Sequence, residues 1–273
     1  MLFCLFSQID SLPKHPAYAN TKGGAFHMII LSGQPVTNEQ LASFQLEGQK
    51  RIILMQLQAS NDTFRYRQAS DLLFEVTLRS NIMNAARDLN KSGASFAIFQ
   101  RSRANDAFWR VSEAGALELR YQVEPSRGIQ DIFENGSKYA FECATAIVIV
   151  FYMGVLQTVG EEKFNRRLRS LTLYDWHYDT LSIYTERGND FIYGDCLYFE
   201  NPEFSYQQSQ WRGENVIYLG EDQYYGHGLG ILTAAEIIDK LNKRRRPGAV
   251  QSAYLLPQTT RMDVIYLRQM FGS

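Results

Sequence analysis

Cys143 is the residue of this sequence best suited to act as a nucleophile. It stands in the segment FECAT and begins an uncharged, mostly apolar stretch that runs to Gly160. A stretch of this kind predicts a buried helix, and the N-terminus of a helix favours the thiolate form of a cysteine. Most single cysteines, however, are inert packing residues. The position of Cys143 alone therefore leaves catalysis and packing both open.

A thiol nucleophile often works with a histidine that a third polar group orients. His177 lies in the aromatic segment YDWHY, which is typical of a structural histidine. His227 lies between glycines in YGHGLG, where another backbone or a ligand can come close. A hairpin turn explains these glycines equally well. Cys196, in GDCLY, is predicted to lie within a strand and to pack in the core.

Carboxylates also stand in places where they could take part in chemistry. Glu142 directly precedes Cys143, and Glu214 follows a glycine at the start of the apolar segment ENVIYLG. A residue at the start of a strand can project its carboxylate toward a site, but it can equally be a solvated edge residue. The composition does not decide between these two interpretations of Glu214.

Hydrophobic periodicity indicates the elements that must position these residues. Helical spacing of apolar residues predicts helices at 37–58 and 68–90, then a short helix within 125–136 and the long apolar helix from Cys143. Gly93 is expected to end the second helix with a positive φ. A further helix should start at the capping box TAAE, which begins at Thr233, and end at Pro247.

Aromatic and β-branched runs between polar turns predict the strands. They fall at Phe96–Phe99, Trp109–Val111, Leu117–Tyr121, Ser182–Thr185, Phe191–Tyr193, Cys196–Phe199, Asn215–Leu219 and His227–Leu232. Helices therefore dominate the first part and strands the second, so we expect a single α+β domain. Residues 28–273 should form this domain, with residues 1–27 as a disordered N-terminal extension or a mis-assigned start, because they show no sustained period.

The composition excludes several classes of partner. The formal net charge of −1 gives no general attraction for nucleic acid or anionic lipid, and the basic run 243–246 suits the end of a helix. Three cysteines and four histidines without metal-ligand spacing predict neither a disulfide framework nor a metal site. The apolar start of the chain is too short for a signal peptide, and the stretch from Cys143 is interrupted by Thr145 and Gln157. We therefore expect a protein that folds in a reducing cytoplasm, outside the membrane and without a cofactor.

Several long segments resemble one known family, the protein-glutamine γ-glutamyltransferases of spore-forming bacteria. They are KSGASFAIF, WRVSEAGALEL, ENGSKYAFECATAIVIV, YDWHYDTLSIYTE, GDCLYFENPEF, QWRGENVIYLGED, HGLGI and QSAYLL. The resemblance runs from Met28 to about Arg268. It implies a single domain built on the papain-like cysteine-peptidase core that cell-wall endopeptidases of the NlpC/P60 type share.

The resemblance also implies a set of site residues. Cys143 would be the nucleophile, Glu214 its main partner and Glu142 a partial substitute. We add His227 to the candidate site residues on its position in the sequence, and expect it to matter less than either carboxylate, in a supporting role that orients one of them. The family encloses its thiol in an apolar tunnel. On composition and position in the sequence we expect the walls of that tunnel to include Trp176, Trp211, Tyr198 and Phe96, and core packing is the competing interpretation for each of these aromatic residues.

The implied reaction joins glutamine and lysine side chains of spore coat proteins through a thioester. The resemblance places such an enzyme in the mother-cell cytoplasm first and then on the spore surface, without secretion. A cysteine amidase or endopeptidase on the same core is the alternative, because water can replace the amine. A non-catalytic coat component is the third class, and loss of Cys143 or Glu214 would indicate it; both residues are present.

Overall fold

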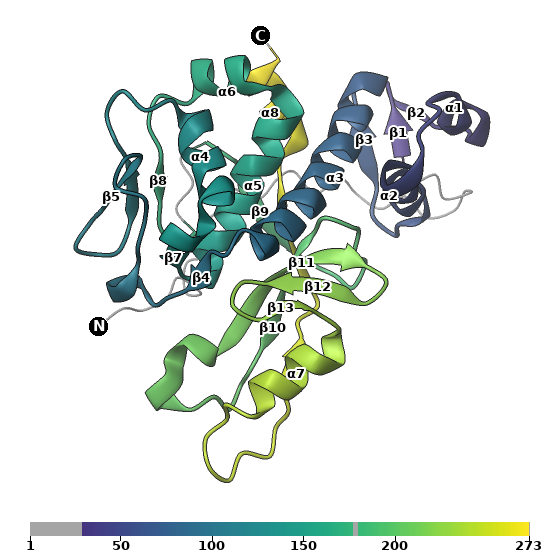
Figure 1. Ribbon diagram of the computed structural model, residues 1–273. Helices are drawn as coiled ribbons and strands as arrows, with labels where there is room; N and C mark the ends of the chain where they lie inside the picture. The colour runs from purple at the N-terminus through teal and green to yellow at the C-terminus, as the bar shows by residue number, and fades with distance from the viewer. Residues whose placement is uncertain (1–28, 177–179, 273) are drawn as a thin grey trace.

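The structure is a computed structural model that describes residues 29–176 and 180–272. The expected extension 1–27 and His177 lie outside the described residues, so the proposed domain start stays a prediction. Figure 1 shows a central group of helices with a sheet beneath it and a small lobe to one side.

Two long helices packed side by side form the centre of the molecule. They are α3 (Ala69–Lys91) and α5 (Cys143–Val159). A Cβ atom at Gly154 would lie 2.8 Å from Cγ1 of Ile82, so the glycine lets the two helices come close. Gly93 follows α3 with a φ of 87°, as predicted.

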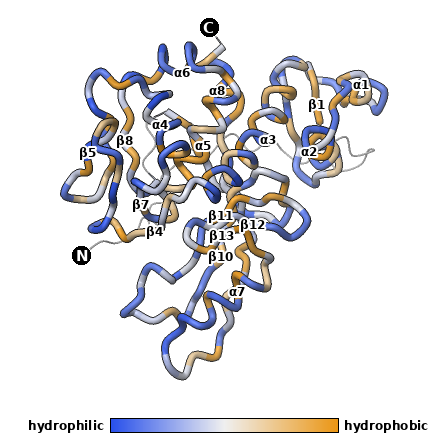
Figure 2. The backbone as a smooth tube through the Cα atoms, in the orientation of Figure 1, coloured by the Kyte–Doolittle hydropathy of each residue, from blue (hydrophilic) through white to orange (hydrophobic). Residues whose placement is uncertain are grey.

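The other helices lie beside this pair, on the opposite face of the sheet, or in the side lobe. They are α4 (Pro125–Glu134), α6 (Glu161–Arg167), α7 (Ala234–Asn242) and α8 (Val264–Phe271), with α1 (Asn38–Ser43) and α2 (Gly48–Ala59) in the side lobe. Most residues of α5 are buried, and its tube in Figure 2 is largely orange, whereas α1 buries no residue. In the part of the chain that the structure describes, no helix combines the length and the hydropathy that a membrane span requires.

An antiparallel sheet packs against the helix pair, with strands in the order β13-β12-β11-β10-β15-β9 and β14 paired to β10. Its strands are β9 (Ile183–Arg187), β10 (Cys196–Glu200), β11 (Gly213–Gly220), β12 (Gln223–Gly226), β13 (Gly230–Leu232), β14 (Tyr254–Leu255) and β15 (Gln258–Met262). All of these strands follow α5 in the chain, so the expected mixed fold of helix and sheet is confirmed.

Shorter sheets complete the fold. β2 (Gln34–Pro35), β1 (Ile29–Leu31) and β3 (Phe64–Tyr66) form the side lobe with α1 and α2. β5 (Trp109–Val111), β6 (Leu117–Leu119) and β8 (Thr172–Leu173) form another sheet, while β4 (Ser95–Phe96) runs parallel to β7 (Ala140–Phe141). The pairing of β4 with β7 fixes the chain immediately before Cys143.

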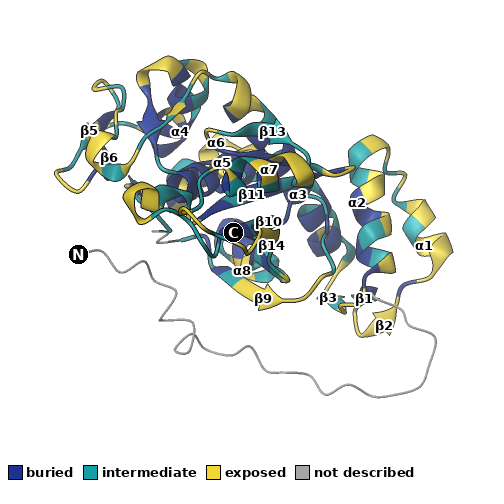
Figure 3. Cartoon of the chain, turned by 90° about the horizontal axis from the view of Figure 1, so that it is seen from below, coloured by how far each residue is buried: buried dark blue, intermediate teal, exposed yellow. Residues whose placement is uncertain are grey.

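Side chains of the large sheet alternate between two apolar cores. Ile217 and Leu219 of β11 belong to the main core around α3 and α5, whereas Val216 belongs to a smaller core beside α7. This is the alternation of a strand that is buried on both faces. Buried residues accordingly gather in Figure 3 where α5, β10 and β11 meet. The sheet therefore presents β11 directly to the helix that begins at Cys143.

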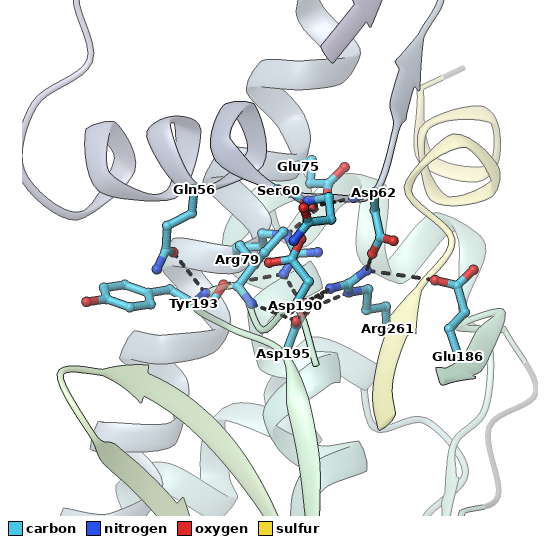
Figure 4. A network of polar contacts seen from close by, with 12 residues as sticks. Gln56, Ser60, Asp62, Glu75, Arg79, Glu186, Asp190, Tyr193, Asp195 and Arg261 are labelled. Atoms are coloured by element: carbon cyan, nitrogen blue, oxygen red, sulfur yellow. Dashed lines mark hydrogen bonds and ion pairs between the residues drawn. The ribbon is translucent and has the colours of Figure 1, made fainter. Parts of the chain in front are cut away.

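Buried charged residues join the helix pair to the sheet. Asp195, immediately before β10, is fully buried and accepts from Nη1 of Arg79 in α3 at 2.6 Å. It also accepts from Nε and Nη2 of Arg261 in β15, each at 2.8 Å, and Arg79 pairs with Glu75 (Figure 4). Burial alone would raise the pKa of Asp195, but Arg79 and Arg261 hold it below its usual value. We call these four residues the buried ion network.

The structure differs from the sequence prediction at helix ends. The single predicted helix 37–58 is two helices, because the chain turns between them and Gln45 has a φ of 50°. The helix that starts after Thr233 has the expected capping box but ends at Asn242, not at Pro247. Beyond it the chain bonds to another loop, where Ser205 N–H donates to Arg244 O at 2.9 Å. The helix α8 was not predicted.

Some predicted strands are shorter or absent. The segment Phe96–Phe99 pairs only at its first residue and then enters a 3-10 turn. Phe191–Tyr193 forms no strand, because its backbone N–H groups bond to side chains and not to another strand. The N–H of Ile192, for example, donates to the carboxylate of Asp195 at 2.9 Å. His227 was expected in a strand, but it lies in the turn between β12 and β13.

Candidate active site

The nucleophile candidate begins α5 at the point where strand changes to helix. Glu142 is the N-cap of α5, and its carboxylate accepts from the backbone N–H of Ala144 at 2.8 Å. The other oxygen of the same carboxylate, Oε1, accepts from the thiol of Cys143 at 3.0 Å. The capping residue therefore also holds the proton of the thiol, and Cys143 is only 5% exposed.

Glu214 comes from the start of β11, where it is paired with Phe199 of β10. It is 2% exposed, and its Oε1 has no hydrogen-bond partner among the described residues. A Cβ atom at Gly226 would lie 3.1 Å from this oxygen, so the glycine leaves room for the carboxylate. The edge-residue interpretation of Glu214 is wrong, because the side chain is buried.

Burial and mutual repulsion make the acidic groups of the site weak acids. Burial raises the pKa of the Cys143 thiol well above its usual value, and the charges of Glu214 and Glu142 raise it further. Burial and then the charge of Glu142 likewise raise the pKa of Glu214, although Arg244 opposes them. The helix N-terminus thus does not make Cys143 a resting thiolate, contrary to the sequence argument. Both Cys143 and Glu214 keep their protons more tightly than in water.

His227 lies beside this site but contacts other groups. Its ring stacks on Phe141, with centroids 4.7 Å apart, and Nδ1 lies 3.1 Å from the hydroxyl of Tyr225. Among the described residues its Nε2 has no hydrogen-bond partner. Burial lowers the pKa of His227 to about 4, so the ring is neutral at physiological pH. The structure therefore supplies no imidazolium, and the supporting role of His227 stays a prediction.

Three of the four expected tunnel residues gather around the start of β11. Trp211 stacks on Phe96, with ring centroids 6.2 Å apart. Tyr198 pairs with Asn215 across the strands, and a Cβ atom at Gly213 would lie 2.2 Å from its hydroxyl oxygen. Burial raises the pKa of Tyr198, and the charge of Cys143 adds to this effect. Trp176 packs against the main core instead. The wall role of all four stays a prediction.

Sequence reasoning missed further residues around the thiol. The side-chain amide of Asn215 points its Nδ2 at Sγ of Cys143, at 3.8 Å. The guanidinium of Arg244 lies 3.7 Å from the ring centroid of Trp211. Asp175, whose N–H donates to Thr145 at 2.9 Å, has its pKa raised by burial and then by Glu142. Asn215 stands beside Glu214 in the RGEN segment, and this position could have indicated it as a site residue. The basic run around Arg244 gave no signal of a place in the site.

Elsewhere in the described ranges, 29–176 and 180–272, these features do not recur together. Cys196 is buried in the main core, and burial raises the pKa of its thiol, so its interpretation as a packing residue is confirmed. An open polar depression of about 480 Å³ is lined by Asn84, Arg87 and Gln157. It lies near the far end of α5, about 20 Å from Cys143 at the rise of an α-helix. The chemistry therefore concentrates at the N-terminus of α5.

Comparisons with known proteins show the family of this chain. Residues 28–271 match the model of the family described as protein-glutamine gamma-glutamyltransferase. Over 246 residues the chain is 99% identical to the protein-glutamine gamma-glutamyltransferase of Bacillus pumilus (strain SAFR-032), covering 90% of this chain and 100% of that protein. Over 237 residues it is 54% identical to the protein of the same name from Bacillus subtilis (strain 168), covering 87% and 97%.

A solved structure is similar as well. The transglutaminase from Geobacillus stearothermophilus, without its C-terminal extension, superposes with a TM-score of 0.72 at 53% identity. The match covers 75% of this chain and 99% of that one. The chain therefore belongs to the protein-glutamine gamma-glutamyltransferase family of acyltransferases.

Proposed function

We propose that this enzyme transfers the γ-glutamyl group through a thioester on Cys143. One observation carries the proposal: the thiol at the N-terminus of α5 donates to Glu142 at 3.0 Å. A second buried carboxylate, Glu214, has an oxygen without a hydrogen-bond partner among the residues that the structure describes. A nucleophile beside its own proton acceptor is the arrangement that covalent catalysis requires.

The reaction has two halves, and a carboxylate serves in each. The sulfur of Cys143 attacks the γ-carboxamide carbon of glutamine while its proton passes to a carboxylate. The carboxylic acid then protonates the departing nitrogen and the C–N bond breaks. Ammonia departs, and a thioester remains on Cys143. A lysine amine next attacks the thioester and gives its surplus proton to the carboxylate. The C–S bond breaks, the carboxylic acid returns the proton to the sulfur, and the isopeptide bond remains with the thiol restored.

Burial raises the pKa of both groups that share the proton, the thiol of Cys143 and the carboxyl of Glu214. In water a thiol and a glutamic acid have pKa values of about 8.5 and 4.3, which makes the transfer unfavourable by roughly 6 kcal/mol. In this site burial and Glu142 raise the pKa of Glu214, so its carboxylate is a stronger base than in water. Cys143, Glu142 and Glu214 then exchange protons as one coupled set.

The papain-like core of the NlpC/P60 type is also part of the proposal. Two features support it: the nucleophile begins a buried helix, and that helix packs on an antiparallel sheet whose strand β11 carries the partner Glu214. Here a carboxylate takes the position that a histidine holds in the peptidases. The neutral, stacked ring of His227 is consistent with such a division of roles.

Incubation with a glutamine-containing protein and a fluorescent primary amine tests the activity. We expect covalent incorporation of the amine, its complete loss in Cys143→Ala, and most of it retained in Cys196→Ala. Incorporation by Cys143→Ala would overturn the thioester proposal. Release of ammonia without incorporation would identify an amidase, and cleavage of the protein chain an endopeptidase.

Spore coat proteins are the proposed donors and acceptors, with synthesis in the mother-cell cytoplasm and deposition on the spore surface. The similarity to Bacillus transglutaminases, from a genus that forms spores, supports this assignment. Coats from a strain carrying Cys143→Ala should contain fewer isopeptide cross-links and release more protein on extraction. Equal cross-link content in mutant and parent coats would contradict it.

A further inference from the structure

The sulfur of Cys143 has a hydrogen-bond acceptor and a donor on different elements. Glu142 supplies the acceptor, whereas Nδ2 of Asn215 in β11 is the donor, at 3.8 Å. Asn215 has the same position in the pleat as Ile217 and Leu219, whose side chains lie in the main core around α3 and α5, and its amide reaches Cys143 at the start of α5.

Both donors near the sulfur are otherwise unused. Among the described residues, the amide of Asn215 makes no hydrogen bond except the one to Cys143. The backbone N–H of Cys143 itself has no acceptor there, because the carboxylate of Glu142 binds the next N–H, that of Ala144. Buried or half-buried donors are usually paired, so these two are available for a group that arrives with the substrate.

The chemistry creates such a group twice. When the sulfur attacks the carboxamide, and again when the amine attacks the thioester, the carbonyl oxygen becomes an oxyanion bound to the carbon that carries the sulfur. This oxygen therefore forms close to Sγ. Glu142 and Glu214 repel a negative charge at this place, so N–H donors are needed to stabilise it.

We propose that the side-chain amide of Asn215 and the backbone N–H of Cys143 form the oxyanion hole of this enzyme. The inference rests on the proposed thioester reaction and makes Asn215 a catalytic residue that contacts the reacting oxygen. Each donor neutralises charge in both halves of the reaction, so the loss of Asn215 slows acylation and deacylation together.

Kinetics of Asn215→Ala and Asn215→Asp test the proposal against two other roles, thiolate stabilisation and packing. We expect kcat for amine incorporation to fall about 10²–10³-fold in both, as for loss of one oxyanion donor, with a small change in KM. Asn215→Asp keeps the shape but cannot donate, so it should be no better than Asn215→Ala. Asn81→Ala is the matched control, because the side-chain amide of Asn81 donates a hydrogen bond to Thr158 near the far end of α5.

Alkylation by iodoacetamide separates the roles, because it uses the thiolate without forming an oxyanion. At high pH, where the thiol is fully ionised, the alkylation rate of Asn215→Ala should equal that of the parent. A peptide aldehyde, whose adduct with the thiol carries the oxygen, should lose affinity by about the same factor as kcat. Equal losses in alkylation and incorporation would show a packing role, and unchanged incorporation with a raised alkylation midpoint would show thiolate stabilisation. If Cys143→Ala is inactive, either of these two results overturns the assignment of the oxyanion hole alone. Activity in Cys143→Ala would instead overturn the thioester proposal.

Discussion

The carboxylate of Glu142 accepts from the thiol of Cys143 at 3.0 Å and from the helix N–H of Ala144 at 2.8 Å. One side chain thus holds the proton of the nucleophile and caps the helix that carries it. The direct hydrogen bond belongs to Glu142, whereas Glu214 affects the thiol through its charge. In the proposed reaction, both carboxylates serve as acceptors of this one proton.

The first prediction concerns this redundancy. Glu142→Gln and Glu214→Gln should each lower amine incorporation but stay above the background of Cys143→Ala, and the double variant should fall to that background. Groups that act on one proton give such non-additive losses. Incorporation rates measured on folded variants test this. Glu236→Gln, which changes the cap of α7, is the control and should stay active. A double variant that still works would exclude both carboxylates as bases.

The second prediction is a loss of stability in acid caused by His227. Its pKa is lowered to about 4 in the folded protein, while it is about 6.5 in the unfolded chain. The stabilisation is therefore complete above the unfolded value and is lost as pH falls toward about 4. It amounts to about 3 kcal/mol of unfolding free energy. Urea unfolding at several pH values should show this slope in the parent and not in His227→Gln.

Glu214 provides a contrast of opposite sign in the same experiment. Its pKa is raised on folding, so its contribution is complete below its unfolded value of about 4.3 and is lost as pH rises. Relative to the parent, Glu214→Gln should gain stability with rising pH, whereas His227→Gln should gain it with falling pH. Parallel curves for both variants would contradict the two assignments.

The third prediction concerns Arg244, which lies over Trp211 and opposes the raised pKa of Glu214. Without this positive charge the pKa of Glu214 rises further, so the acid limb of the pH–rate profile should move to higher pH in Arg244→Ala. Lys243→Ala removes a charge from the same run at an exposed pair with Asp239, and its profile should match the parent. Identical shifts in both variants would indicate a general charge effect.

The fourth prediction concerns the buried ion network. Asp195→Asn leaves Arg79 and Arg261 buried without their shared carboxylate, which should cost about 3–5 kcal/mol of unfolding free energy. The midpoint of denaturant unfolding measures this loss. Asp239→Asn breaks an exposed pair with Lys243 and should cost at most about 1 kcal/mol. Comparable losses in the two variants would show that the network does not stabilise the fold.

Local patterns predicted the elements that depend on local physics. The apolar run after Glu142 and the capping box at Thr233 both fix helix starts through neighbouring residues, and both helices begin where expected. The sequence failed where distant residues decide. β15, with the segment QTTRM, has little apolar alternation and becomes a strand because β9 and β10 lie on either side of it.

The site shows the same division. Recognisable segments contain Cys143, Glu142 and Glu214, and the structure places these residues together. Arg244 reads as an ordinary charge at a helix end, and only the fold shows that it reaches Trp211. Asn215 stands in the recognisable RGEN segment, but only the fold shows its contact with Cys143, because that contact joins separate elements. Such contacts depend on tertiary packing, which the period of a single element does not encode.

Heating should affect the buried ion network between the helices and the sheet differently from the apolar core around it. The hydration of charged groups becomes less favourable as temperature rises, so the desolvation cost of Arg79, Asp195 and Arg261 decreases. The network is then relatively stronger in hot water than in cold. Arg79 stands on α3, which packs against α5, and Asp195 precedes β10, which pairs with β11. The ion pair between them therefore helps to hold Cys143 and Asn215 in their relative positions. The distances around the thiol should therefore change less on warming than those in the side lobe of α1 and α2.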